Sequence, residues 1–229
     1  MAFIVAIDGP AGTGKSSVAR LVAKKLNFIY VDTGAIYRAL AVLAIQHGID
    51  AYDEQGLANL TCHLKLAIDE KNACTQILLD GHKVERELRQ EKISGLASVV
   101  SQHQLVRTQL LQLQRDVVTH IKGGAIYEGR DIGTVVFPKA GLKIFITANS
   151  KTRAMRRFEE IQKMHKEVSF DEILESIEKR DERDKNRMAA PMQKAHDAKV
   201  IDTSHMTIQE VCDKTIELVN EAQKNYQEG

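Results

Sequence analysis

Short apolar runs recur along the chain, and each has the length of a buried strand rather than that of a helix. The predicted strands are residues 3–7, 28–31, 125–128, 142–146 and 199–203. Apolar positions at helical spacing predict helices at residues 15–25, 35–47, 105–121, 151–166, 170–187 and 208–223. This alternation predicts an α/β protein with a parallel sheet.

A different pattern interrupts the alternation between residues 50 and 104. Residues 64–68 and 75–79 have strand character, and Asp80-Gly81 is a strong hairpin signal before a third short strand at 82–84. We expect an inserted antiparallel lobe. It could be a structural addition, but we favour a flap that grips substrate, because the polar stretch 32–38 leads directly into it.

The first strand runs without a gap into a glycine-rich stretch, and residues 9–16 fit G-x-x-x-x-G-K-[ST]. Glycines let consecutive backbone N–H groups converge on a polyphosphate, and the next helix directs its positive end to the same place. Lys15 adds charge, and the Ser16 hydroxyl can bind Mg²⁺. A chance match is the alternative, but few such matches lie between a buried strand and an amphipathic helix. The predicted ATP-binding residues are Gly9, Pro10, Ala11, Gly12, Thr13, Gly14, Lys15, Ser16 and Ser17.

Polar residues stand at the carboxyl ends of three predicted strands, where open α/β sheets bind ligands. They are residues 32–34, 129–134 and 147–150. Arg38 lies in the first turn of the helix after the first of these groups, so we expect it to face the same cleft. An exposed helix arginine is the alternative at that position.

Arginine is also concentrated in two later predicted helices. One helical turn of a basic segment holds Arg153, Arg156 and Arg157. In the next helix, Arg180, Asp184 and Arg187 stand at i, i+4 and i+7, which predicts one shared face. Each group could be a solvated surface. Beside a triphosphate site, we favour a closing lid for the first and a cleft-facing surface for the second.

These features indicate a kinase whose acceptor is itself a phosphate. Transfer of a γ-phosphoryl group depends mainly on positioning and charge stabilisation. Arg38, Arg130 and Arg187 are available to hold an anionic acceptor through paired hydrogen bonds. A GTPase is disfavoured, because the chain has no N-K-x-D sequence and its D-x-x-G, residues 53–56, follows no predicted strand.

Composition limits the partners that we expect. The chain has 32 Lys plus Arg against 31 Asp plus Glu, so bulk charge attracts neither nucleic acid nor a membrane. The three cysteines have no C-x-x-C spacing and follow no secretory leader, which favours the cytoplasm. No apolar run is long enough to span a membrane. We expect one domain, a monomer with small-molecule substrates.

The chain resembles the bacterial cytidylate kinases, which are P-loop proteins of the nucleoside monophosphate kinase family. The resemblance covers nearly the whole chain and rests on IDGPAGTGK at 7–15, DTGAIYR at 32–38, GRDIGTVVFP at 129–138 and RDERDKNR at 180–187. It implies reversible transfer of the ATP γ-phosphoryl group to CMP or dCMP with Mg²⁺. It also implies a three-layer P-loop fold with a five-stranded parallel core. The expected division is core at 1–33, 105–150 and 166–229, a monophosphate-binding insert at about 34–104, and a short lid at about 151–165.

The resemblance further implies roles for single residues. The CMP-binding residues would be Thr33, Arg38, Ser101, Arg107, Arg130, Asp131, Arg180, Asp184 and Arg187. Of these, Arg38, Arg130 and Arg187 would bind the phosphate. Ser101, Arg107 and Asp131 would contact the cytosine, and Arg180 and Asp184 the sugar. The catalytic group would be Lys15, Arg130, Arg153, Arg157 and Arg187.

Three points remain open at the level of sequence. Ser16 is the expected Mg²⁺ ligand, and Asp32 is a candidate that would act through water. The chain departs from the family where Thr33 replaces a frequent serine and Glu128 a common aspartate, but neither change removes a required group. The alternatives are a kinase for UMP or AMP, which would differ in the base pocket, and a non-catalytic ATP-binding switch.

Overall fold

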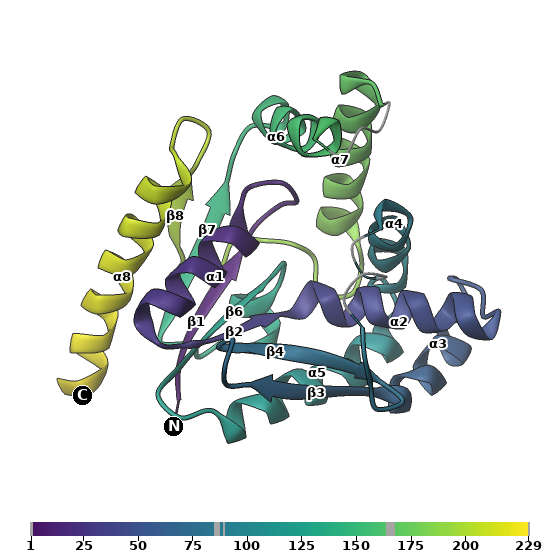
Figure 1. The fold of residues 1–229 in the computed structure, drawn as a ribbon, viewed down its shortest axis with the longest axis horizontal. Coiled ribbons are helices and arrows are strands. Elements are labelled where there is room, and N and C mark those ends of the chain that lie inside the picture. The colour runs from purple at the N-terminus through teal and green to yellow at the C-terminus, as the bar shows by residue number, and fades with distance from the viewer. Residues whose placement is uncertain (1, 85–87, 89, 164–167, 229) are drawn as a thin grey trace.

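A computed structural model describes residues 2–84, 88, 90–163 and 168–228, and within them one eight-stranded sheet runs through the molecule (Figure 1). The parallel part of this sheet has the order β2 (Ile29–Asp32), β6 (Gly124–Gly129), β1 (Phe3–Asp8), β7 (Leu142–Thr147) and β8 (Lys199–Asp202). The predicted five-stranded parallel core is therefore confirmed.

The predicted antiparallel strands are also present, and they extend the same sheet. β3 (Leu64–Asp69), β4 (Cys74–Leu79) and β5 (His82–Lys83) pair in antiparallel order. β4 continues the core next to β2, where Tyr30 pairs in parallel with Cys74. The hairpin thus lengthens the sheet beyond β2 (Figure 1).

Two groups of helices cover the parallel core, which makes three layers. Alternate residues of a strand point to opposite faces, so Val5 and Ile7 pack in one core cluster and Ala6 in another. The first cluster lies under α1 (Lys15–Leu26) and α8 (Ile208–Glu228). The second lies under the 3₁₀ turn η3 (Val117–His120) and a π-helical turn, η4 (Ile132–Val136).

A further apolar cluster is built outside the parallel core. It joins α2, α3, α4 and α5 to the antiparallel strands. The bounds of these helices are Thr33–His47, Glu54–Leu60, Glu91–Val100 and Gln104–Asp116, with a 3₁₀ turn, η1, at Thr61–His63. The sequence interpretation had no helix at α3 or α4, because short helices between strand-like segments give a weak periodic signal.

The helices α6 (Ser150–Gln162) and α7 (Phe170–Asn186) pack against each other over a small cluster of their own, at the top right of Figure 1. α7 begins with a capping box, which Ser169 and Glu172 form. Part of the predicted helix 151–166 lies outside the described residues. No helix among the described residues is long and apolar enough to cross a bilayer.

Two helix boundaries differ from the prediction in ways that affect the site. α2 begins at Thr33 rather than at residue 35, because the Asp32 carboxylate accepts a hydrogen bond from the Ala35 N–H at 2.9 Å. α7 ends at Asn186, and Arg187 has extended backbone. The helix thus ends one residue earlier than predicted, but the Arg187 N–H still donates to the Arg183 carbonyl at 3.0 Å, and Arg180, Asp184 and Arg187 line the same cavity.

Candidate active site

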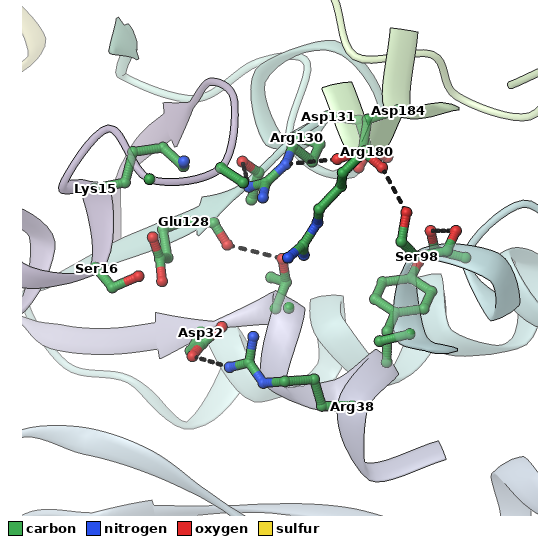
Figure 2. Close-up of a pocket in the computed structure, with 18 of the residues that line it drawn as sticks. Lys15, Ser16, Asp32, Arg38, Ser98, Glu128, Arg130, Asp131, Arg180 and Asp184 are labelled. Atoms are coloured by element: carbon green, nitrogen blue, oxygen red, sulfur yellow. Dashed lines mark hydrogen bonds and ion pairs between the residues drawn. The ribbon is translucent and has the colours of Figure 1, made fainter. Parts of the chain in front are cut away.

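A cavity of about 350 Å³ opens at the carboxyl ends of β1, β2 and β6. Its lining comes from the P-loop (residues 9–16), the start of α2, the end of α4, the loop after β6, and α6 and α7. Figure 2 shows the basic and acidic side chains that point into it from these elements. The volume is in the range of pockets that bind small ligands.

The P-loop turns tightly at the end of β1, and the turn depends on glycine. Gly9 has φ +144°, and a Cβ there would lie 1.9 Å from the carbonyl oxygen of Ile146. Lys15 Nζ donates to the Pro10 carbonyl at 2.6 Å and to Thr13 Oγ1 at 3.3 Å. Burial, together with repulsion from Arg130, lowers the pKa of Lys15. An anion at the loop would reverse part of this effect.

On the opposite side of the cavity, four side chains from separate segments form one buried group, the Asp131 cluster. Its members are Ser101, Arg107, Asp131 and Arg187. The Asp131 carboxylate pairs with Arg107 through one oxygen and with Arg187 Nη2 at 3.3 Å through the other. Arg187 also donates to Ser101 Oγ at 3.3 Å, and Arg107 to the Ser101 carbonyl at 3.1 Å. The cluster thus holds two guanidinium groups and one carboxylate away from water.

Arg130 and Asp184 link the two sides of the cavity. Arg130 Nε lies 3.0 Å from Asp184 Oδ2, and Asp184 Oδ1 accepts from Ser98 at 3.3 Å (Figure 2). Burial acts to raise the pKa of Asp184, but Arg130, Arg180 and Arg187 outweigh it and hold that pKa below its usual value. The side chain of Arg180 extends towards the middle of the cavity in Figure 2.

At the start of α2, two predicted site residues already have partners. Arg38 Nη2 lies 2.7 Å from Asp32 Oδ2, while Asp32 Oδ1 caps the helix. Thr33 Oγ1 donates to the Glu128 carbonyl at 2.8 Å. Because both Asp32 oxygens accept hydrogen bonds within the protein, Asp32 is less available to position water on a metal than its sequence position indicated.

Glu128, at the end of β6, is the acidic side chain beside the P-loop. Its carboxylate accepts from Tyr30 at 2.8 Å and is hydrogen-bonded by Ser16. Burial and the nearby Asp32 raise its pKa, opposed by Lys15. The sequence interpretation noted Glu128 only as a departure from the family. Its position at a strand end directly before Gly129-Arg130 was the signal that could have identified it as a site residue.

The three arginines of α6 take different positions. Arg156 and Arg157 line the cavity, whereas Arg153 is buried beneath the P-loop. Arg153 donates to the carbonyls of Ala11 and Ala148, both at 3.0 Å, and pairs with Asp181 at 2.6 Å. It therefore holds the P-loop and α7 together in this structure. Arg156 donates to Thr203 at the end of β8.

Most of the predicted site residues lie around this one cavity. The predicted residues in its lining are Ala11, Gly12, Gly14, Lys15, Ser16, Ser17, Asp32, Thr33, Arg38, Ser101, Arg107, Arg130, Asp131, Arg157, Arg180, Asp184 and Arg187. Gly9, Pro10, Thr13 and Arg153 support the P-loop from outside the lining. Lining residues that had no predicted individual role are Gly34, Tyr37, Ala97, Ser98, Glu128, Gly129 and Glu160, whereas Arg156 was expected in the lid. The roles themselves remain predictions.

The arrangement suits the transfer of a phosphoryl group between two anions. The P-loop side of the cavity offers backbone N–H groups and a lysine, and the side of the Asp131 cluster offers arginines and a buried carboxylate. Residues between the two sides can stabilise the charge that develops during transfer. The Ser16 hydroxyl and the Glu128 carboxylate are hard oxygen donors of the kind that Mg²⁺ prefers. Among the described residues, no group of three or more histidine, cysteine or acidic side chains could hold a metal.

Comparison with known proteins identifies relatives along nearly the full chain. The model of a family described as cytidylate kinase matches residues 5–221. A cytidylate kinase of Bacillus pumilus is 42% identical over 220 residues, covering 96% of this chain and 97% of the relative. One from Vibrio cholerae is 42% identical over 216 residues, covering 94% and 95%. One from Carboxydothermus hydrogenoformans is 43% identical over 215 residues, covering 94% and 96%.

Solved structures resemble the chain in fold alone. An uncharacterised protein from Eubacterium ventriosum has a TM-score of 0.53 at 13% identity, covering 95% of this chain and 98% of that protein. A gluconokinase from Sinorhizobium meliloti has a TM-score of 0.50 at 10% identity, covering 100% and 99%. At these identities, the likeness concerns the arrangement of strands and helices.

Proposed function

The chain belongs to the cytidylate kinase family, and we propose that its cavity transfers the γ-phosphoryl group of ATP to CMP or dCMP. One observation carries the assignment of the two sides: the P-loop and the Asp131 cluster line the same cavity. ATP occupies the P-loop side, and the monophosphate occupies the side of the Asp131 cluster.

The cytosine is recognised by the Asp131 cluster. Cytosine presents a donor, N4–H₂, beside the acceptors N3 and O2, so a carboxylate and a guanidinium side by side match its edge. Asp131 and Arg107 are such a pair, and Ser101 lies against both arginines of the cluster. Uracil carries the acceptor O4 where cytosine carries N4–H₂, so it would meet the carboxylate without a proton between them.

The acceptor phosphate is bound by Arg38, Arg130 and Arg187. Each of these guanidinium groups now pairs with a carboxylate, on Asp32, Asp184 and Asp131 respectively. When the acceptor phosphate binds, charge-assisted hydrogen bonds from its oxygens to the three arginines replace part of these carboxylate contacts. The arginine side chains therefore need only small changes of conformation. Arg180 and Asp184 bind the sugar.

Transfer itself relies on positive charge held on both sides of the moving group. Lys15 and the P-loop N–H groups bind the ATP phosphates, while Arg130 and the lid arginine Arg157 balance charge on the transferred oxygens. Arg153, the other predicted lid arginine, contributes by holding the P-loop through the Ala11 carbonyl. Bound Mg²⁺ would neutralise phosphate charge and orient the donor. Ser16 would hold that ion, with Glu128 placed to accept from its waters. Asp32 is the lesser candidate for that role, because Ala35 and Arg38 already occupy its two oxygens.

A panel of acceptors tests the assignment. ADP release is measured with ATP and CMP, dCMP, UMP or AMP, with Lys15→Ala as the inactive control. We expect turnover with CMP and dCMP well above that with UMP and AMP. A preference for UMP or AMP would assign the base pocket to another nucleotide, and ATP binding without acceptor-dependent turnover would favour the switch.

The remaining predictions concern state and location. We propose a cytoplasmic monomer that acts on small molecules. The balanced charge of 32 basic and 31 acidic residues disfavours nucleic acid as a partner. Light scattering on the purified protein measures its mass in solution. A mass of twice 25.6 kDa would contradict the monomer.

A further inference from the structure

The residue directly before the P-loop, Asp8, has no part in the roles described so far. It is the last residue of β1, its side chain is buried, and only 5% of its surface is exposed. A carboxylate in that environment is costly unless it is well hydrogen-bonded. Its two oxygens accept from two consecutive backbone N–H groups, those of Ile132 at 2.8 Å and Gly133 at 2.7 Å.

Those two N–H groups belong to the loop that carries Arg130 and Asp131. The loop leaves β6 at Gly129, and Ile132 begins the π-helical turn η4. Arg130 and Asp131 are therefore enclosed between the end of a central strand and a pair of hydrogen bonds to Asp8. Because Asp8 also precedes Gly9, one carboxylate connects the loop that binds ATP with the loop that contacts the acceptor.

The fit around this connection is close. A Cβ added at Gly133 would lie 3.1 Å from Lys143 Cδ and 3.4 Å from Asp8 Oδ2. On the other side of η4, Arg115 donates to the carbonyls of Val135 and Val136 at 3.0 and 2.9 Å. The turn is thus held at both ends, and the end nearest the acceptor residues is held by Asp8.

The chemistry of the contact requires a carboxylate rather than an amide. Two N–H donors converge on the two oxygens, and each oxygen accepts one of them. An asparagine could offer an oxygen to one donor only, because its NH₂ group would face the other. Burial raises the pKa of Asp8 to about 6, so the protein keeps a carboxylate where it is unfavourable.

We propose that Asp8 is a positioning residue, whose carboxylate holds the loop of Arg130 and Asp131 in register with the P-loop. This inference rests on the proposed function of that loop in acceptor binding. Asp8 itself contacts no substrate. Its removal should therefore affect the acceptor more than ATP, because the P-loop keeps its own bonds through Lys15, Thr13 and Arg153.

The experiment compares Asp8→Asn and Asp8→Ala with the wild type, using the monophosphate that the wild type phosphorylates best. We expect kcat/KM for the acceptor to fall about tenfold or more, the loss of one hydrogen bond to a charged group, and the KM for ATP to stay within about twofold. Asp53→Asn is the matched control: Asp53 accepts from the Gly56 N–H at 2.9 Å at the start of α3, far from the cavity lining. It should leave both constants unchanged.

A second variant reaches the same contact from the other side. Gly133→Ala keeps the carboxylate but adds a Cβ 3.1 Å from Lys143 Cδ, so that the Lys143 side chain beside the Asp8 contact must shift. It should lower kcat/KM for the acceptor, as Asp8→Asn does. This variant therefore still tests the proposal if an Asp8 variant does not fold.

Three results would overturn the proposal. The first is unchanged kinetics in a folded Asp8→Asn protein with a lower melting temperature, which would make the residue structural only. The second is an equal rise of KM for ATP and acceptor, and the third is normal acceptor kinetics in Gly133→Ala. A wild type that prefers UMP or AMP would contradict the CMP assignment alone, because the Asp8 comparison is then made with that acceptor.

Discussion

At the scale of single residues, the cavity is organised by carboxylates that each fix an arginine. Asp131 fixes two of them, Arg107 and Arg187, while Asp32 and Asp184 fix Arg38 and Arg130. A substitution of an acidic residue therefore also changes the position of its arginine partner.

The choice of base is the first prediction at this scale. If Asp131 accepts a hydrogen bond from cytosine N4, Asp131→Ala should lower kcat/KM for CMP, and it should lower kcat/KM for UMP by less. A contact of this kind is worth roughly 1 to 3 kcal/mol, so the CMP/UMP ratio should narrow by a factor of about 5 to 150. Steady-state kinetics with both acceptors measure it.

Arg130→Ala is the control for Asp131→Ala, because Arg130 is assigned to the phosphate that CMP and UMP share. It should depress both acceptors alike and leave their ratio nearly fixed. If Asp131→Ala also lowers kcat/KM for CMP and UMP equally, Asp131 acts by positioning its partners Arg107 and Arg187. Ser101 and Arg107 would then be the residues that contact the base.

The second prediction concerns stability and pH at Asp8. The folded pKa of about 6 exceeds the ordinary value of 3.8, so between these values the folded protein binds a proton that the unfolded chain does not. The stability contributed by this group therefore rises as pH falls, by roughly 1 to 2 kcal/mol at pH 5.

Melting temperatures of the wild type and Asp8→Asn at pH 7 and pH 5 measure this effect. Between pH 7 and pH 5, the melting temperature of the wild type should rise relative to that of Asp8→Asn by about 3 to 5 °C. The charged groups that act on Asp8 are Lys15 from α1 and Asp131 after β6. Lys143 from β7 lies beside Gly133, and its ammonium pairs with Asp197. A constant difference between the two pH values would show that Asp8 keeps an ordinary pKa.

At the scale of elements, the sequence predicted those whose signal is local. The core strands and the strand, glycine-rich turn and helix of the P-loop follow from short-range patterns, and each is confirmed. The positions of arginines were harder to predict. Arg187 reaches the cavity from beyond the end of α7, and Arg153 lies under the P-loop while Arg157 lines the cavity. Helical spacing predicts which residues share one face of a helix. It does not predict which element packs against that face, because this depends on tertiary packing.

Arg153 gives the prediction that belongs to this scale, since it joins α6, α7 and the P-loop. Arg153→Ala would leave Asp181 as a buried charge without its partner, which costs about 3 to 5 kcal/mol. It also frees the Ala11 carbonyl, so KM for ATP should rise. Chemical denaturation and kinetics measure the two effects.

Arg157→Ala is the comparison for Arg153→Ala. Arg157 is a third exposed and pairs with Glu160 one turn away, so its loss should change stability by less than about 1 kcal/mol. Equal destabilisation by both variants would contradict the bracing role of Arg153.

At the scale of the whole molecule, the two sides of the cavity should stabilise the fold independently. A ligand at one hundred times its Kd adds about 2.7 kcal/mol of stability, which for a chain of this size raises Tm by roughly 5 to 11 °C. ATP and CMP should each do so in the wild type. Lys15→Ala should lose most of the ATP shift and retain the CMP shift. If Lys15→Ala loses the Tm shifts with both ATP and CMP, Lys15 supports the folded structure rather than binding the ATP phosphates.

The position of β1 in the sheet has a consequence for how the chain acquires its structure. β1 is the first strand in the sequence, yet its hydrogen-bonded neighbours, β6 and β7, follow only after all the helices and strands from α1 to α5. During synthesis, the amino-terminal strand must wait unpaired until more than half of the chain has emerged. Such long-range parallel pairing is slow to form, because the entropy of closing the intervening loop is lost before the contacts are gained. Polypeptides that stop before β7 should therefore stay unfolded and require chaperones, although they contain the complete P-loop.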